Sequence, residues 1–287
     1  MMIKSSLKSV LPSILIEAIR ASRENIYKAS ITSALKEQKL DLIYSSLCNW
    51  VPDITDHYST FRVNTEFLHA KVRGQHAFQI AMLQKTFEYL NIADPVDMTI
   101  VDIGDSAGTH LQYLHEIYPK VRSLSVNMDK NAVHKIRAKG MEAIHCRAQD
   151  LQKQNIHADI YISFEMLEHL SDPIDFLHSL SGTRCRALVV TVPFLRVSRV
   201  GLYHIRFLRE EEIFAENTHY FELCPSDWKL IFQHAGWIVA FDQIYYQYPQ
   251  IGLFRLLKST WKKNDFEGFY GAILVRNDRW SKCYRDW

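Results

Sequence analysis

Residues 100–110 read IVDIGDSAGTH, in which an apolar run reaches the carboxylate of Asp102 and continues through two glycines, Gly104 and Gly108. An apolar run followed by such a turn and by helical spacing indicates a strand–turn–helix unit. At the edge of an open α/β sheet, this turn offers a ligand backbone N–H groups and little side-chain bulk. The alternative is a tight turn without a ligand, which the glycines alone do not exclude.

Two ligand classes bind at such a turn, namely dinucleotides and S-adenosylmethionine. The dinucleotide fingerprint is G-x-G-x-x-G, whereas here the spacing is G-x-x-x-G, with Ser106 between the glycines and Leu111 where a third would stand. The charge of Asp105 would also lie beside the phosphates of a dinucleotide. S-adenosylmethionine has no phosphate and carries a sulfonium, so it tolerates carboxylates at positions 102 and 105.

The ends of the next two strands offer polar groups to the rest of a nucleoside. A group about 20 residues after the turn normally binds the ribose hydroxyls, and Asn127 holds this position, with Asp129 as an alternative. Asp129 could instead only cap the following helix. Gln149 or Asp150 would lie beside the adenine, although Asp150 could also be a solvated turn residue.

Three histidines are candidates for a base, because methyl transfer to a hydroxyl is helped by a group that titrates near neutral pH. His169 follows the fourth strand, whereas His204 and His219 lie in a later, long connection. His169 could instead pack under the sheet edge, and the other two could be solvated. His110 and His115, on the first helix, are expected to be structural or exposed.

The elements that would position these residues alternate between apolar runs and amphipathic stretches from residue 97 onward. The apolar runs cover 98–104, 123–127, 142–146, 158–164 and 186–194. Such runs, separated by helices, indicate a parallel sheet covered on both faces. After a helix at 225–237, the runs 237–246 and 266–277 are expected to pair as an antiparallel edge.

The chain divides into a helical N-terminal cap, residues 1–92, and an α/β domain, residues 93–287. The clearest helix of the cap covers 64–90, with Asn64 or Thr65 at its start. Residues 195–222 are too many for a simple connection, and an insertion of this length is typical of a lid or binding loop.

Composition narrows the range of partners. A net charge of +2 argues against a nucleic-acid partner. The five cysteines are scattered without zinc spacing, which predicts reduced thiols in a cytoplasmic protein and no metal site. The apolar patch near the N-terminus is too short to span a membrane and predicts an amphipathic helix. Residues 251–263 mix apolar and basic side chains, which fits either a membrane-surface contact or a packed helix with a solvated face.

Several segments resemble the class I S-adenosylmethionine-dependent methyltransferases in order and spacing, over about residues 97–245. They are VDIGDSAGTH, AQDL, ISFEMLEHLSDPIDFL, VVTVPF and HYFELCPSDWKLIFQHAGW. The resemblance is closest to the small-molecule branch that includes the ubiquinone-biosynthesis type. It implies a Rossmann-like, doubly wound fold and S-adenosylmethionine as cofactor. Ser106 and Asn127 depart from the usual glycine and acid.

The resemblance also implies which residues surround the cofactor. They are Asp102, Gly104, Asp105, Ser106 and Gly108 at the methionine end, Asn127 at the ribose, Gln149 and Asp150 at the adenine, and Phe164 and Glu165 beneath the sulfonium. An N-terminal helix often covers the cofactor in such enzymes, so Arg73 could pair with the methionine carboxylate or lie on a solvated face. The expected activity is O-methylation of a small molecule, a sugar or glycan, or a lipid-linked precursor. The alternatives are a cofactor-binding inactive scaffold and an NAD-dependent oxidoreductase.

Overall fold

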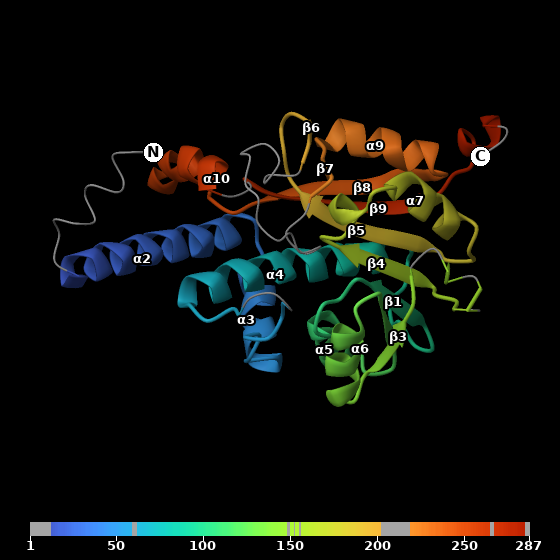
Figure 1. Ribbon diagram of the computed structural model, residues 1–287, viewed down its shortest axis with the longest axis horizontal. Helices are drawn as coiled ribbons and strands as arrows, with labels where there is room; N and C mark the ends of the chain where they lie inside the picture. The colour runs from blue at the N-terminus through green and yellow to red at the C-terminus, as the bar shows by residue number, and fades with distance from the viewer. Residues whose placement is uncertain are drawn as a thin grey trace.

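The computed structural model describes residues 13–58, 62–147, 150–151, 153–154, 156–201, 219–264 and 267–284. Its centre is a seven-stranded sheet with strands in the order β3-β2-β1-β4-β5-β9-β8 (Figure 1). The strands are β1 Thr99–Ile103, β2 Arg122–Asn127, β3 Glu142–His145, β4 Ile160–Phe164, β5 Ala187–Pro193, β8 Trp237–Tyr246 and β9 Gly268–Arg276. The Rossmann-like, doubly wound fold predicted from the sequence is confirmed.

One strand of this sheet is reversed. β9 pairs antiparallel with both β5 and β8, whereas β1 to β5 pair with one another in parallel. The predicted antiparallel pair at the sheet edge is therefore present, although the reversed strand lies one place inside the edge. Because the other strands all run in one direction, their carboxyl ends meet along one rim, where ligands of such sheets bind.

Helices cover both faces of the sheet, as periodic apolar side chains require. One face carries α2 Ser13–Glu37, α3 Asp41–Trp50, α4 Glu66–Tyr89, α5 Thr109–Ile117 and α6 Lys130–Ala138, and the other carries α7 Pro173–Ser181 and α9 Pro225–His234 (Figure 1). α4 begins as predicted, since the Thr65 hydroxyl accepts from the Leu68 N–H at 3.2 Å. The Asp172 carboxylate caps α7 in the same way, accepting from the Asp175 N–H at 2.9 Å.

The N-terminal helices share a hydrophobic core with the sheet. Phe78 of α4 stacks on Tyr245 of β8 with ring centroids 5.7 Å apart. A Cβ on Gly271 of β9 would lie 2.7 Å from the Phe78 ring, so only glycine permits this close packing. α4 is therefore fixed against the sheet, and its polar residues are held at the rim of β1 and β5.

The insertion returns to the sheet through a two-stranded ribbon, β6 Arg199–Val200 and β7 Phe221–Glu222. At Gly201, a Cβ would stand 1.7 Å from the carbonyl oxygen of His219, so a side chain there would push the two arms apart. This close approach fixes His219 beside the rim. Residues 202–218, including His204, lie outside the described residues.

The first part of the segment 251–263 exposes apolar side chains, whereas Trp261 in its second part is buried. Leu253 and Leu256 of η4 Leu253–Leu257 are exposed, and so is Ile251, two residues before this helix. In α10 Lys258–Asn264, Trp261 is buried, and its ring centroid lies 5.5 Å from that of Tyr27. Across the described ranges, no helix combines the length and apolar character needed to cross a bilayer. The predicted N-terminal helix is described only from Ser13 onward.

Candidate active site

The turn after β1 contains two residues with positive φ angles, and both of them are glycines. Gly104 and Gly108 have φ values of 100° and 77°, in the left-handed region that favours glycine. A Cβ on Gly104 would lie 3.0 Å from Met166, and one on Gly108 would lie 2.8 Å from Met141. Protein atoms thus occupy the space where these side chains would be, so turn geometry and packing already require both glycines.

Beside the turn, three side chains form a buried charged group that we call the turn triad: Asp102, Asp105 and His110. Each is at most 5% exposed, and His110 Nδ1 lies 3.1 Å from Asp102 Oδ2 and 3.7 Å from Asp105 Oδ1. Apart from these ion pairs, no group in the described ranges partners the four carboxylate oxygens. Two buried carboxylates thus face a single imidazole, and buried charge that is only partly compensated is costly, so the triad fits a cationic ligand group.

The electrostatics of the triad follow from its burial. Burial raises the pKa of Asp102 to about 6, the charge of Asp105 adds to this rise, and His110 opposes it. For His110, burial lowers the pKa, but the two carboxylates outweigh it and leave the pKa above its usual value. The triad therefore retains protons to a higher pH than the isolated side chains would.

Polar side chains of α4 and of the loop before it form a hydrogen-bond network that contacts the turn triad. Gln79 Oε1 accepts from His110 Nε2 at 3.0 Å, and Gln79 Nε2 donates to Thr191 Oγ1 at 3.1 Å. His57 lies 3.0 Å from the Thr109 hydroxyl and 3.2 Å from His76, nitrogen to nitrogen. Burial lowers the pKa of both histidines well below the usual range, so they are neutral hydrogen-bonding groups. This network links the N-terminal helices to the turn.

Arg73 is buried and bonded to other protein groups, whereas pairing with the cofactor carboxylate would require a guanidinium that faces the cofactor site. It is 2% exposed and donates to the carbonyl oxygens of Leu47 at 3.0 Å and Val51 at 2.6 Å, and also to the Tyr113 hydroxyl. Its guanidinium joins α3 and the following loop to α5, which is a structural role. The burial of Arg73 also contradicts the solvated helix face that the sequence offered as its alternative place.

Asn127 and Asp129 hold the turn and the next helix. Asn127 Nδ2 donates to the Asp105 carbonyl oxygen at 3.1 Å, and its Oδ1 accepts from the Asp129 N–H at 2.8 Å. The Asp129 carboxylate accepts from the Asn131 N–H at 2.8 Å, which makes Asp129 the cap of α6. The capping role considered for Asp129 is present, and Asn127 stabilises the turn from the adjacent strand end.

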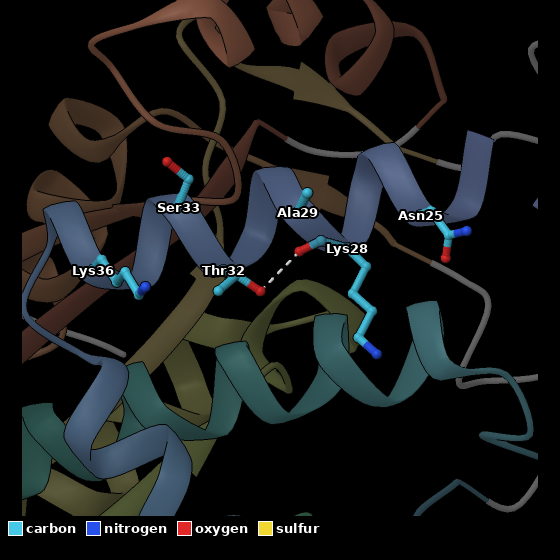
Figure 2. Close-up of a pocket in the computed structure, with 6 residues that line it drawn as sticks. All are labelled: Asn25, Lys28, Ala29, Thr32, Ser33 and Lys36. Carbon is cyan, nitrogen blue, oxygen red and sulfur yellow. Dashed lines mark hydrogen bonds between the residues drawn. The ribbon is translucent and has the colours of Figure 1, made fainter. Parts of the chain in front are cut away.

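A surface hollow lies beyond the carboxyl ends of β2 and β3, where the adenine was expected. It is lined by Met128, His145, Cys146, Arg147, Asp150, Lys153 and Gln154. Asp150 is paired with Lys153 at 2.7 Å, and Gln149 lies outside the described residues. Another hollow runs along α2 (Figure 2), but its side chains spread along the helix instead of converging, and Thr32 is bonded to the Lys28 carbonyl oxygen.

The end of β4 turns sharply beside the glycine turn. Phe164 packs edge-on against His110, with ring centroids 5.1 Å apart. Glu165 has a φ of 52°, which non-glycine residues adopt rarely and which often marks functional sites. Met166 then lies against Gly104. This turn delivers the short helix η2, Leu167–His169, to the rim next to the turn triad.

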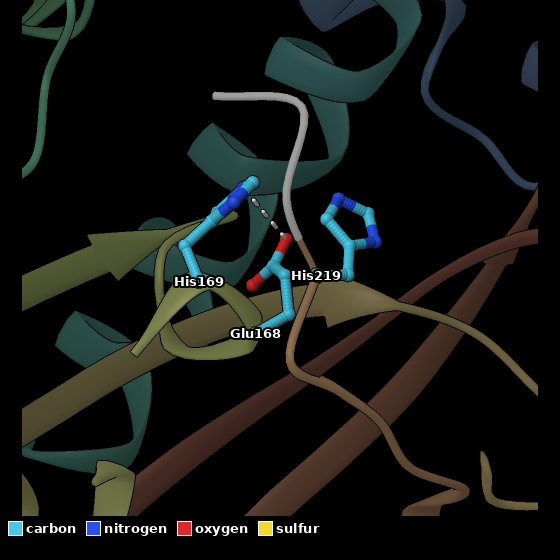
Figure 3. A group of neighbouring side chains, drawn as sticks. All are labelled: Glu168, His169 and His219. Atoms are coloured by element: carbon cyan, nitrogen blue, oxygen red, sulfur yellow. Dashed lines mark ion pairs between the residues drawn. The ribbon is translucent and has the colours of Figure 1, made fainter. Parts of the chain in front are cut away.

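Three side chains converge at the start of the ribbon, and we call them the rim cluster: Glu168, His169 and His219 (Figure 3). His169 Nε2 lies 3.8 Å from Glu168 Oε1, and the two imidazole centroids are 4.7 Å apart. Burial raises the pKa of Glu168 to about 7, with Glu222 adding to the rise and His169 opposing it. Two of the three predicted catalytic histidines are therefore brought together, 50 residues apart in the chain.

The ribbon fixes the cluster. The Tyr220 N–H donates to the Glu168 carbonyl oxygen at 2.7 Å, and Glu222 lies 3.3 Å from His219 Nδ1 while also pairing with Arg199. Sequence reasoning missed Glu168 and also His110, which is buried in the turn triad, whereas His115 is exposed as expected. The available signals were a carboxylate directly before His169 and a histidine two residues after Gly108.

Comparisons with known proteins agree with this geometry. A family model described as "Methyltransferase domain" matches residues 101–183, which include the turn triad, Asn127 and η2. A search of curated proteins finds no match.

Solved structures with a similar fold include two that cover most of the chain. The [4+2]-cyclase SpnF is 13% identical, with a TM-score of 0.52 over 85% of this chain and 96% of that one. Magnesium protoporphyrin IX methyltransferase from Synechocystis PCC 6803, with bound S-adenosylhomocysteine, is 11% identical, with a TM-score of 0.50 over 75% of this chain and 89% of that one. At such identities the likeness establishes the fold, and the fold alone does not name the reaction.

The glycine turn, the two buried carboxylates that share one histidine and the family match lead to one conclusion. The chain carries a methyltransferase domain of the class I fold, and its cofactor is S-adenosylmethionine.

Proposed function

We propose that the chain transfers a methyl group from S-adenosylmethionine to an oxygen of a small molecule, a sugar or glycan, or a lipid-linked precursor. The observation that carries this proposal is the juxtaposition of two sites on one rim. The turn triad offers negative charge to a cationic cofactor, and the rim cluster offers nitrogen and oxygen groups to an acceptor. The order of the matching sequence segments favours the small-molecule branch that includes the ubiquinone-biosynthesis type.

The residues proposed to hold the cofactor follow from its chemistry. Its methionine end would lie at Asp102, Gly104, Asp105, Ser106 and Gly108, its ribose at Asn127 or Asp129, its adenine at Gln149 and Asp150, and its sulfonium above Phe164 and Glu165. Bound S-adenosylmethionine supplies a methyl group on a positively charged sulfur. The two carboxylates of the turn triad, which share a single imidazole, fit that charge.

The acceptor would be activated at the rim cluster. As the acceptor oxygen bonds to the methyl carbon, the carbon–sulfur bond breaks and the acceptor O–H must lose its proton. His169 and His219 are the groups proposed to act on that oxygen, and His204, in the insertion, is a further candidate. Residues 1–92 would serve as a helical cap of the domain 93–287, and the insertion 195–222 would border the acceptor.

The exposed apolar side chains at 251, 253 and 256, beside Arg255 and Lys258, support a peripheral contact with a membrane. Such a contact would suit a lipid-linked acceptor. Binding to vesicles with and without anionic lipid tests it, and loss of binding in Leu253→Ser with Leu256→Ser is the expected result.

The test of the function combines calorimetry and label transfer. We expect one S-adenosylmethionine to bind per chain and a labelled methyl group to reach an acceptor in a panel of phenols, sugars and lipid-linked glycans. Cofactor binding without transfer to any acceptor would favour the inactive scaffold. Binding of a nicotinamide dinucleotide instead of S-adenosylmethionine would favour the oxidoreductase and contradict the proposal.

A further inference from the structure

The carboxylate of Glu168 is the least explained polar group of the rim cluster. Glu168 is 1% exposed, and its Oε2 has no hydrogen-bond partner in the part of the chain that the structure describes. The Oε1 atom lies 3.8 Å from His169 Nε2, and His219 also offers a ring nitrogen within 4.8 Å of the carboxylate. An uncompensated buried carboxylate is costly, and this one points into the space between two imidazoles (Figure 3).

The three side chains have the donor set of a metal centre. Glu168, His169 and His219 each offer one ligand atom, and these atoms lie within 4.8 Å of one another. Ligands around one transition-metal ion lie about 3.3 Å apart for bonds of about 2 Å, so side-chain rotations of about 1 Å close the set. Two imidazoles with one carboxylate suit borderline ions such as Zn²⁺, Co²⁺ or Mn²⁺ better than Mg²⁺.

The surroundings support the same assignment. Glu222 lies 3.3 Å from His219 Nδ1, and Arg199 pairs with Glu222. A carboxylate on the distal nitrogen of a metal-binding histidine orients the ring and makes it more basic. His219 would then bind through Nε2. His169 and His219 are 20% and 18% exposed, so an ion and a ligand from solvent can reach them.

We infer that the rim cluster binds one divalent first-row transition-metal ion through Glu168, His169 and His219. Three protein ligands leave a coordination position open, as in catalytic metal sites. This inference rests on the proposed function for its role: the open position would take the acceptor oxygen and lower the pKa of its hydroxyl. The histidines would then act as ligands, and the absence of metal expected from the cysteine spacing would not hold for this site.

The experiment is a titration of the metal-free full-length chain with Co²⁺, followed by optical absorption and calorimetry without cofactor or acceptor. We expect one Co²⁺ per chain, displaced by Zn²⁺ and much less effectively by Mg²⁺. Glu168→Gln and His219→Gln should each weaken binding by at least 100-fold, and Glu222→Gln by about 10- to 100-fold. His115→Gln, which removes an exposed histidine of α5 outside the cluster, is the matched control and should bind as the wild type does.

His110→Gln separates this site from the turn triad, which also brings a histidine and two carboxylates together. Unchanged Co²⁺ affinity in His110→Gln supports the rim cluster, whereas loss there with retention in His219→Gln overturns the assignment. Circular dichroism and a cooperative thermal transition show that the variants are folded. Co²⁺ should raise Tm for the wild type and leave it unchanged for Glu168→Gln.

Absence of stoichiometric binding by the wild type also overturns the metal site. Methyl transfer that persists in the metal-free enzyme leaves the proposed function standing with the histidines as bases. Metal binding without any methyl transfer leaves the metal site standing and contradicts the proposed function.

Discussion

The turn triad and the rim cluster are built from the same kinds of side chain, yet their surroundings differ. In the turn triad, all three residues are buried, and Gln79 and the histidines of the neighbouring network support it from α4 and the loop before it. In the rim cluster, only Glu168 is fully buried, and both histidines are partly exposed on a turn and a two-stranded ribbon. A buried, braced charge suits a tightly held cofactor, whereas partly exposed imidazoles suit an acceptor that enters and leaves.

The largest effect is expected from removing the chemistry of the rim cluster. His169→Gln and His219→Gln should each lower kcat for methyl transfer by about 10²- to 10⁴-fold, the usual contribution of a group that assists proton removal. Cofactor affinity should change by less than about threefold. Label transfer to the acceptor found by screening measures kcat, and calorimetry measures affinity. A large loss of cofactor affinity would contradict the assignment of the rim cluster to the acceptor and of the turn triad to the cofactor.

Substitutions in the turn triad should instead lower the affinity for the cofactor. Asp105→Asn removes a buried charge facing the proposed cofactor, so S-adenosylmethionine affinity should fall by about 100-fold, or about 2.7 kcal/mol, typical of a lost charge-assisted contact. Asp56→Asn, at an exposed surface carboxylate, is a control and should bind normally. Calorimetry of both variants is the measurement. Unchanged affinity in Asp105→Asn would contradict the placement of the methionine end.

The pH dependence of stability distinguishes the triad further. Because the pKa of Asp102 is raised to about 6 in the folded state, folding takes up protons between about pH 4 and pH 6, and the free energy of unfolding falls as pH rises through this window. The raised pKa of His110 acts in the same direction. Asp102→Asn removes the first effect and reduces the second, because only Asp105 then remains to raise the pKa of His110.

Asp102→Asn should therefore be more stable than the wild type at pH 7.5, by about 2 kcal/mol, and lose this advantage at pH 4.5. Urea unfolding of the cofactor-free protein at both pH values measures the difference. A stability difference that is the same at both values would show that Asp102 does not carry a raised pKa.

The smallest effect is expected at the far end of the proposed cofactor site. Asp150 is partly exposed and already paired with Lys153, so Asp150→Asn should weaken cofactor affinity by less than about fivefold. The same calorimetric titration measures it, with Lys153→Met as the matched change of its partner. A loss as large as that for Asp105→Asn would move the main recognition of the cofactor from the triad to the adenosine end.

The strand positions and the fold class could be predicted from the sequence because their signals are local. The apolar runs at 98–104 and 186–194 became β1 and β5, and Thr65 and Asp172 cap α4 and α7 as expected. The roles of Arg73 and His110 could not be predicted. Arg73 points into the loop after α3 and His110 toward Asp102, because each packs against chain that is distant in sequence.

The sequence by itself determined the alternation of strands and helices, the glycine turn and the histidines available at the rim, since spacing and turn chemistry act within a few residues. Only the tertiary structure decided which of those groups meet. His169 and His219 converge because the ribbon arms approach at Gly201, and α4 braces the turn because Phe78 packs against Gly271. Such contacts depend on close packing between distant segments, which no local pattern encodes.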